Sequence, residues 1–517
     1  MNLISKIPNE IKDVLETLEK GDFEAYLVGG CVRDLIMNRE PKDWDITTNA
    51  KPEEIQEVFA KTVYENKFGT VAVFTAPAKA LAKEGKKNEN LSPTDIVEIT
   101  PYRLEAKYSD HRHPDKVIFG NKLEDDLKRR DFTVNAMAMD SAGNIKDIYQ
   151  GQKDIKDKSL RTVGKSDERF KEDALRMIRA VRFAVELNFT VSHETMEGII
   201  KNTELIEKIS AERIHDEFEK IIMSPNPMMG IVLLNKFGLL KHIIPELEEG
   251  IGCDQKGEHI YDVWEHILKS LQHATDKKFP LHVKLAALFH DIGKPKTRRT
   301  APMPKIKDKA RLPDGQGLRM PKAYTFYGHE VVGAKMTEKI LERLKFPKKI
   351  TDTVIKLVRY HMFFSDPDQI TLSAVRRLVG NVGPDLVWDL INVRMCDRIG
   401  MGKPKEEPYR LRKYESMIEE AMRAPVSVSM LKMDGNKIME ITGEKPSPRL
   451  GWILHALLEE ALDNPDINTE EYLEKRVKEF TKLSDQDLHK LGIAGQESKE
   501  EAEEQELGII RKKYGVK

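Results

Sequence analysis

The segment between residues 25 and 48, AYLVGGCVRDLIMNREPKDWDITT, contains residue types that bind phosphates and metal ions. An apolar run ends in Gly29 and Gly30 and leads into a helical pattern. Because glycine has no side chain, the backbone N–H groups of such a turn can approach a phosphate closely. Arg33 lies just inside the helix and can add a forked, charge-assisted contact to phosphate oxygens. A glycine pair alone is a weak signal, and the residues that follow strengthen it.

Two aspartates, Asp43 and Asp45, stand on either side of Trp44. If DWDIT forms a strand, residues i and i+2 point to the same side, and both carboxylates face one point. Hard oxygen ligands of this kind suit Mg²⁺, which takes one or two carboxylates plus substrate phosphates. A solvated turn is the plain alternative for the pair alone. With the glycine turn and arginine upstream, we expect Asp43 and Asp45 to be catalytic Mg²⁺ ligands.

The elements that must position these residues alternate between strand and helix up to about residue 150. We expect an amphipathic helix over residues 1–20, strands at EAYLV, DWDIT, GTVAVFT and DIVEIT, and helices at VRDLIM and PEEIQEVF. The lysine- and asparagine-rich residues 79–94 fit a solvated hairpin insertion. From residue 166 onward, strand signals almost vanish and apolar residues recur at helical spacing. The sequence therefore predicts an α/β head followed by a long helical part.

The composition limits the classes of protein to consider. A chain of 517 residues is expected to hold several domains, and a formal net charge of −1 means that any nucleic-acid binding must come from local patches. Cys31, Cys253 and Cys396 lie far apart without a pairing pattern, which fits a reducing compartment. No apolar run suits a membrane span or a signal peptide. We therefore expect a soluble cytoplasmic protein without a membrane partner.

A second motif, LKRRDFTVNAMAMD, occupies residues 127–140. Arg129 and Arg130 are adjacent, so on a helix only one of them can readily face a given triphosphate. Asp131 and Asn135 are one helical turn apart and could orient a ribose or brace the arginines. On composition alone, the segment fits the start of a solvated helix equally well.

A third motif, ERFKEDALRMIRAVRFA, occupies residues 168–184. Its polar residues Asp173, Arg176, Arg179 and Arg182 recur at every third position, while apolar residues fill the other side of the expected helix. Asp173 offers only hydrogen-bond acceptors and Arg176 only donors, so together they can match the exocyclic groups of C or A and reject G and U. An ordinary intrahelical Asp–Arg pair is the plain alternative.

Together, the three motifs resemble the signature of the class II nucleotidyltransferases of the DNA polymerase β superfamily, which include tRNA nucleotidyltransferases (CCA-adding enzymes) and bacterial poly(A) polymerases. The resemblance implies a polymerase β-like palm, Mg²⁺ at Asp43 and Asp45, and CTP, ATP and the 3′ end of tRNA as partners. The implied nucleotide-binding residues are Gly29, Gly30, Arg33, Arg130, Asp131, Asn135, Asp173, Arg176, Arg179 and Arg182. Residues 102–117 are similar to the family's flexible loop, which is thought to help the switch from C to A. Glu98 is a candidate third carboxylate.

A separate cluster of metal-ligand residue types lies between residues 259 and 400. The candidate ligands are His266, His290, Asp291, His329, His361 and Asp397, each within a helical apolar segment. A lone histidine there would more often be a core residue, but six ordered candidates favour a metal centre that suits Mn, Fe, Ni, Co or Zn. The series resembles the HD phosphohydrolase superfamily, which implies water activation near a phosphate, with Lys294 as a phosphate contact. His329 and His361 would permit a second metal ion.

We expect four domains: an α/β nucleotidyltransferase head (1–150), an all-α neck and body (151–255), an HD domain (256–402) and a helical tail (403–517). The expected function is addition or repair of the 3′-terminal CCA of tRNA, with an appended phosphohydrolase activity. An HD domain is typical of one bacterial branch of the CCA-adding enzymes and not of poly(A) polymerases. The alternatives are a poly(A) polymerase or A-only enzyme, an HD phosphohydrolase with an RNA-binding head, and an RNA-binding scaffold. The basic residues 294–322 could touch RNA phosphates or form a solvated insertion.

Overall fold

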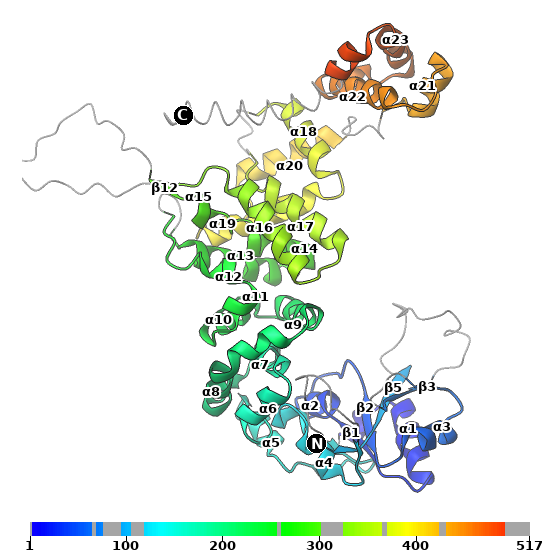
Figure 1. Ribbon diagram of the computed structural model, residues 1–517, viewed down its shortest axis with the longest axis vertical. Coiled ribbons are helices and arrows are strands. Elements are labelled where there is room, and N and C mark those ends of the chain that lie inside the picture. Colours follow the sequence, from blue (N-terminus) through cyan, green and yellow to red (C-terminus); the bar gives the residue numbers. More distant parts are fainter. Residues whose placement is uncertain are drawn as a thin grey trace, which may run out of the picture. The chain divides into compact units, whose positions relative to one another are not determined.

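The computed structural model describes residues 3–64, 69–75, 95–104, 118–255, 260–300, 324–363, 370–422 and 431–491. The chain forms two compact units, whose helices and strands are drawn in Figure 1. The first unit comprises residues 1–251, 275–277 and 339–347, and the second comprises residues 252–274, 278–338 and 348–517. The expected insertion at 79–94, residues 105–117 of the expected flexible loop and the basic residues 301–322 lie outside the described residues. The finer division into four domains stays a prediction.

The first unit contains a seven-stranded mixed sheet with the strand order β3-β4-β5-β2-β1-β8-β9. Its strands are β1 (Ala25–Val28), β2 (Asp45–Thr48), β3 (Thr62–Tyr64), β4 (Val71–Phe74), β5 (Ile96–Pro101), β8 (Ala138–Met139) and β9 (Ile145–Lys146). Strands β2 and β5 run parallel, and the other neighbours run antiparallel. Strands β6 (Arg103–Leu104) and β7 (Ile118–Phe119) form a separate pair. The sheet confirms the predicted α/β head.

The core of the α/β part joins the sheet to helices α1 (Asn9–Lys20), α2 (Gly30–Ile36) and α3 (Pro52–Val58). The buried face of α1 presents apolar side chains at helical spacing, which are Ile11, Val14, Leu15 and Leu18. Trp44 belongs to the same core. The expected helix over residues 1–20 begins only at Asn9, because Pro8 favours an extended Ile7 before it.

The first unit contains nine further α-helices in its described residues, and all of them except α4 follow the last strand of the sheet. They are α4 (Leu123–Lys128), α5 (Gly151–Lys156), α6 (Ser166–Glu172), α7 (Leu175–Leu187), α8 (His193–Asn202), α9 (Ala211–Met223), α10 (Pro227–Lys236), α11 (Leu240–Ile243) and α12 (Pro245–Glu248). Helix α7 packs against α9 and α10, and α6 packs against α8. Two short parallel strands, β10 (Ser159–Leu160) and β11 (Thr190–Val191), pair with each other and so join the segment before α6 to the segment after α7. The helical prediction beyond residue 166 is confirmed apart from such short strands.

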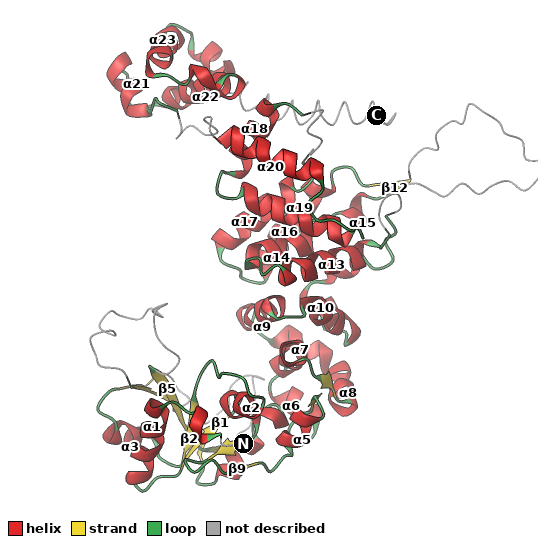
Figure 2. Cartoon of the chain, turned by 180° about the vertical axis from the view of Figure 1, so that it is seen from behind, coloured by secondary structure: helices red, strands yellow, loops and turns green. Residues whose placement is uncertain are grey.

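The described part of the second unit is almost entirely helical (Figure 2). Its helices are α13 (Val263–Asp276), α14 (Leu281–Phe289), α15 (Lys294–Thr297), α16 (His329–Arg343), α17 (Lys348–Tyr360), α18 (Leu372–Val382), α19 (Val387–Gly400), α20 (Tyr409–Met422), α21 (Gly435–Thr442), α22 (Pro448–Asp463) and α23 (Glu470–Phe480), with α13 and α16 each extending into the first unit. Every residue of α14 from Val283 to Phe289 is buried, and the helix packs against α17 and α19. Strands β12 (Arg299–Thr300) and β13 (Tyr324–Thr325) form a short ribbon.

Helices α21 to α23 have an apolar core of their own, which includes Ile438, Ile453, Leu457, Leu473 and Val477. The N-caps Asp434 and Thr469 accept hydrogen bonds from the first turns of α21 and α23, as polar caps do. Among the described helices, none combines the length and apolar character that a membrane span needs.

Candidate active site and candidate metal centre

The glycine turn between β1 and α2 brings three predicted residues together. Gly29 has a φ of +83°, a conformation that residues with a side chain rarely adopt. A Cβ atom at Gly29 would lie 3.0 Å from Arg130 Nη1 and 3.6 Å from Asp45 Oδ2. The backbone of the turn therefore faces a cation and a carboxylate at once. Gly30 begins α2 and faces the Arg33 guanidinium, which would lie 3.6 Å from a Cβ there.

The two aspartates that flank Trp44 do not share a strand. Strand β2 begins at Asp45, and Asp43 lies in the bend before it, so the expectation that both stand on one strand is wrong. Trp44 is 4% exposed and anchors this bend in the core. Burial raises the pKa of Asp45 to about 6, with a further contribution from the Asp43 carboxylate, while Arg130 opposes the shift. The two carboxylates are therefore close enough to interact.

Glu98 lies beside Asp45 in the sheet. The parallel register of β2 and β5 pairs Asp45 with Glu98, so the two side chains stand on the same face of the sheet. Glu98 is exposed, unlike Val97 and Ile99 on either side of it. Its position fits the expectation of a third carboxylate near the aspartate pair, and that role stays a prediction.

The adjacent arginines Arg129 and Arg130 both bind the fully buried carboxylate of Asp126. Arg129 Nη2 donates to Oδ1 at 2.6 Å, and Arg130 Nη2 donates to Oδ2 at 3.0 Å. Burial alone would raise the pKa of Asp126, but the two guanidinium groups hold it below its ordinary value. The bond to Asp126 therefore holds the Arg130 guanidinium in place beside the glycine turn.

Arg33 starts a buried chain of hydrogen bonds that leads away from the glycine turn. Its Nη1 donates to Asn135 Oδ1 at 2.7 Å, and its other edge binds Asp34. Asn135 Nδ2 donates to Asp131 Oδ1 at 3.2 Å, and Asp131 Oδ2 accepts from Arg179 Nη2 at 2.6 Å. Burial opposes ionisation of Asp131, but Arg179 and then Arg176 lower its pKa to about 2. The expected contact between Asp131 and Asn135 exists, although the segment is a 3₁₀ turn rather than an α-helix.

The third motif is not one continuous helix. Helix α6 ends at Glu172 and α7 begins at Leu175, so Asp173 stands in an extended break and does not share a helix face with Arg176. Asp173 binds Arg213 of α9 through both carboxylate oxygens, at 3.2 and 2.7 Å. Its Oδ1 also accepts the N–H of Leu175, the first residue of α7, at 3.1 Å. The expected single helix over these residues is therefore wrong.

The other arginines of the motif are held by oxygen atoms that the sequence did not single out. Arg176 donates to Glu172 Oε2 at 2.8 Å and to the Arg129 carbonyl at 3.0 Å. Arg182 Nε lies 2.7 Å from Oε2 of Glu217, a residue of α9 that is 3% exposed. Arg213 and Glu217 were missed by motif reasoning. Their spacing of four in AERIHDEFEK puts both on one face of α9, which was the available signal.

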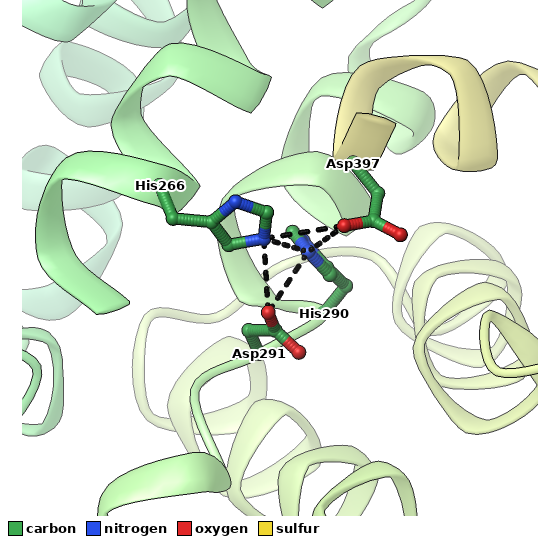
Figure 3. Close-up of side chains that lie close together, drawn as sticks. All are labelled: His266, His290, Asp291 and Asp397. Carbon is green, nitrogen blue, oxygen red and sulfur yellow. Dashed lines mark hydrogen bonds and ion pairs between the residues drawn. The ribbon is translucent and has the colours of Figure 1, made fainter. Parts of the chain in front are cut away.

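In the second unit, four predicted ligands converge from α13, the end of α14 and α19 (Figure 3). His266 Nε2 lies 2.9 Å from His290 Nε2, 2.9 Å from Asp291 Oδ2 and 3.3 Å from Asp397 Oδ1. All four side chains are at most 5% exposed. Gly400 allows this packing, because a Cβ there would lie 2.9 Å from His266 Nδ1.

Asp291 also faces the two remaining histidines. Its Oδ1 lies 3.2 Å from His329 Nε2 and 3.6 Å from His361 Nε2, while its Oδ2 faces the first group. The two Nε2 atoms of His329 and His361 are 3.3 Å apart. One carboxylate therefore lies between two candidate metal-binding groups, and all six predicted residues are brought together.

The donor set fits a transition metal. His290, His329 and His361 each place Nδ1 2.7 to 2.9 Å from the backbone carbonyl three residues earlier. When Nδ1 donates there, Nε2 of the neutral ring carries a lone pair toward the cluster, as in metal-bound histidines. Imidazole nitrogen combined with carboxylate oxygen suits Zn, Mn, Fe, Co or Ni.

Two cations hold the carboxylates of this cluster. Lys294 Nζ lies 2.5 Å from Asp291 Oδ2 and donates to Gln255 Oε1 at 2.6 Å, and Arg394 donates to Asp397 Oδ2 at 2.5 Å. Burial would raise the pKa of Asp291 and Asp397, but the cations and neighbouring histidines hold both well below their ordinary value. Lys294 begins the short helix α15, so the start of the predicted basic loop is helical.

Three known families match successive parts of the chain. Residues 25–161 match the Poly A polymerase head domain, residues 188–251 match the probable RNA and SrmB-binding site of polymerase A, and residues 257–382 match the HD domain. Nucleotidyltransferase and HD domains are generally metal-dependent, in agreement with the candidate ligand groups.

Similar curated proteins are named CCA-adding enzymes. That of Ligilactobacillus salivarius (strain UCC118) is 46% identical over 233 residues, which are 44% of this chain and 54% of that protein. That of Lactococcus lactis subsp. lactis (strain IL1403) is 42% identical over 250 residues, or 48% and 59% of the two chains. The chain thus spans little more than half the length of these relatives.

Solved structures share the fold along most of the chain. The crystal structure of the Bacillus stearothermophilus CCA-adding enzyme in complex with CTP has a TM-score of 0.62 at 24% identity and covers 92% of this chain and 97% of its own. A complex of a CCA-adding enzyme with ATP has a TM-score of 0.56 at 17% identity, with 93% and 97% covered. At these identities the likeness concerns the architecture: a nucleotidyltransferase head followed by helical domains.

Proposed function

We propose that this chain, whose head belongs to the family of the Poly A polymerase head domain, is a tRNA nucleotidyltransferase that adds or repairs the 3′-terminal CCA of tRNA from CTP and ATP without a nucleic-acid template. The observation that carries the proposal is the glycine turn at which Gly29, Arg130 and Asp45 meet. A site of that composition suits a nucleoside triphosphate and a divalent cation. The names of the relatives support this function over that of a poly(A) polymerase. A substrate tRNA is consistent with a cytoplasmic location.

In this proposal the phosphates of the incoming nucleotide lie against the glycine turn. Arg33 and Arg130 neutralise phosphate charge, and both are held in place before the nucleotide arrives. The bonds from Arg33 to Asp34 and Asn135 use three of its five N–H groups. These contacts leave two N–H groups that can donate to phosphate oxygens. Phosphoryl transfer depends mainly on such positioning and charge neutralisation.

Asp43 and Asp45 are the proposed ligands of Mg²⁺. When bound, this ion lowers the pKa of the RNA 3′-hydroxyl and neutralises charge on the phosphate that is attacked. The carboxylates fit it, because hard oxygen atoms are its preferred ligands and because the raised pKa of Asp45 indicates a buried carboxylate with too little positive charge around it. Trp44, between the two aspartates in sequence, is buried in the core and so anchors the start of β2, the central strand of the sheet.

Asp173 and Arg176 are the proposed readers of the base. The hydrogen bonds from Arg213 fix the Asp173 carboxylate. Bonds to Glu172 and to the Arg129 carbonyl fix Arg176. A rigid acceptor and a rigid donor can match the edges of C and A, whereas G and U would leave polar groups unpaired. Arg179 and Arg182, which we expected at the nucleotide, are held instead by Asp131 and Glu217.

The HD domain is proposed to act as a metal-dependent phosphohydrolase. His266, His290, Asp291 and Asp397 would hold one transition-metal ion (Mn, Ni, Co, Fe or Zn), and Asp291, His329 and His361 would hold a second. A bound ion of this kind lowers the pKa of a coordinated water. Lys294 and Arg394 fix the orientation of the two carboxylates.

The test of the nucleotidyltransferase proposal is incorporation of labelled CTP and ATP, separately and together, into tRNA truncated at each 3′ position. Addition of two C residues and then one A residue supports the proposal. Addition of A alone to tRNA ending in CC would indicate an A-only enzyme. Long A tails on unrelated RNA would indicate a poly(A) polymerase, and no incorporation with any divalent metal would overturn the proposal.

A further inference from the structure

Phe183 of α7 lies at the meeting point of three arginine side chains. The guanidinium carbons of Arg182, Arg179 and Arg33 lie 3.9, 5.3 and 5.4 Å from the centre of its ring. Arg33 belongs to α2 and the other two belong to α7, so the ring is a contact shared by two helices of the first unit. Phe183 is 5% exposed, and its ring meets that of Phe132 edge-on, with 5.7 Å between the ring centres.

Each of these guanidinium groups is held from another side by oxygen atoms. The partners are Asp34 and Asn135 for Arg33, Asp131 for Arg179, and Glu217 and Glu186 for Arg182. The ring provides the surface that all three groups have in common. An aromatic face attracts cations, and a planar guanidinium stacks on it, so the ring restrains the plane of each group while keeping like charges apart.

The position of the ring connects two parts of the proposed nucleotide site. Arg33 stands at the glycine turn, where the phosphates are expected. Arg179 binds Asp131, and α7 carries Arg176 near its start, where the base is expected. Without the ring, each arginine keeps its oxygen partners and loses the surface that aligns it with the others.

We propose that Phe183 is a positioning residue for nucleotide binding. Its ring holds the Arg33 guanidinium at the glycine turn in a fixed position relative to Arg179 and Arg182 of α7. This inference rests on the proposed function, since it assumes that the head binds nucleoside triphosphates. In this proposal the ring acts through Arg33, Arg179 and Arg182. Its loss should therefore weaken CTP and ATP binding alike and leave the choice between them unchanged.

The experiment measures dissociation constants for CTP and ATP by isothermal titration with Mg²⁺ and without tRNA, on the full chain. Phe183→Leu removes the aromatic face and is expected to raise both constants about tenfold, in line with desolvated cation–π contacts. Phe183→Tyr keeps the face and is expected to stay within about twofold of the wild-type chain. If Phe183→Leu does not fold, Phe183→Met takes its place, since methionine fills the volume without a cation-binding ring.

Phe170→Leu is the matched control, because Phe170 is a fully buried phenylalanine of α6 whose ring lies beside Gly198 of α8. It should lower the melting temperature about as much as Phe183→Leu and leave both dissociation constants unchanged. Unchanged constants in folded Phe183→Leu, an equal rise in Phe170→Leu, or failure of Phe183→Tyr to preserve binding would each overturn the inference. A wild-type chain that binds nucleotides but incorporates none would count against the proposed function alone.

Discussion

Arg213 holds both carboxylate oxygens of Asp173, with Nη1 3.2 Å from Oδ1 and Nη2 2.7 Å from Oδ2. The two residues come from different segments of the first unit, the break between α6 and α7 and the first turn of α9. Because the same carboxylate also accepts the N–H of Leu175 at the start of α7, its orientation is fixed by two segments at once. A group that reads a base needs this kind of fixed orientation.

The first prediction concerns nucleotide choice. Arg213→Met keeps an apolar stem but removes the guanidinium that holds Asp173, and we expect discrimination against UTP and GTP to fall by about tenfold or more. Triphosphate binding should change by less than about threefold, because the phosphate-side residues are untouched. Single-nucleotide incorporation with each of the four triphosphates measures both effects. Unchanged selectivity in a folded Arg213→Met chain would remove the base-reading role of Asp173.

The second prediction separates the two proposed activities. Asp43→Asn and Asp45→Asn each remove a charge that the proposed Mg²⁺ needs, and we expect nucleotide incorporation to fall by at least about a thousandfold. Hydrolysis of a generic phosphodiester by the HD centre should stay within about twofold, because its ligands lie in the other compact unit. Trp44→Phe, a change in the core between the two aspartates, is the control for disturbance of the bend. Loss of both activities in folded Asp45→Asn would contradict the separation.

Much of the candidate site could be predicted from short motifs because its residues are close in sequence or follow local geometry. The Gly29 turn, Arg130 and Asp45 meet as expected, since the backbone of a glycine turn that leads into a helix is open to neighbouring polar groups. The six HD residues also come together. Their ordered placement in apolar helical segments was the signal, and the buried helix α14 confirms it.

What could not be predicted depends on contacts between distant segments. The break between α6 and α7 contains no glycine or proline that would reveal it in the sequence. Two contacts of the Asp173 carboxylate stabilise it, a local one to the N–H of Leu175 and a distant one to Arg213. The start of β2 at Asp45 likewise follows from its pairing with β1 and β5. The position of Asp291 between two groups of histidines depends on how α13, α14, α16 and α17 pack together. The spacing of apolar residues along the sequence does not specify that packing.

The third prediction concerns stability at low pH. Asp131 has a pKa of about 2 in the folded chain, below its ordinary value of 3.8, because Arg179 and Arg176 outweigh the effect of burial. A group with a lowered folded-state pKa stabilises fully above its unfolded value and loses that contribution as the pH falls toward its folded value. We expect about 2 kcal/mol of unfolding free energy of the head to disappear between about pH 4 and pH 2.

Urea unfolding of the chain at a series of pH values, followed by a probe in the head, measures this loss. Asp131→Asn should be less stable at pH 7 by about 2 kcal/mol, since it removes the carboxylate charge that Arg179 binds most closely, and it should show a smaller decline below pH 4. Asp140→Asn is the control, because Asp140 is a less buried residue that binds Asn144 in a turn. A decline of equal size in Asp131→Asn would assign the effect to other carboxylates.

The last prediction concerns the metal content of the HD centre. Asp291 offers one oxygen to each candidate group, so Asp291→Asn should abolish binding at both positions, whereas His361→Ala should remove only the second ion. The metal bound per chain is measured by mass spectrometry after reconstitution with Mn, Ni, Co, Fe or Zn. It should fall from two ions to none in Asp291→Asn and from two ions to one in His361→Ala. His282→Ala provides the control: His282 stands at the start of α14, is paired with Asp389 at 2.7 Å, and should bind metal like the wild type when changed. One ion per wild-type chain, lost equally in Asp291→Asn and His361→Ala, would show instead a single centre shared by all the histidines.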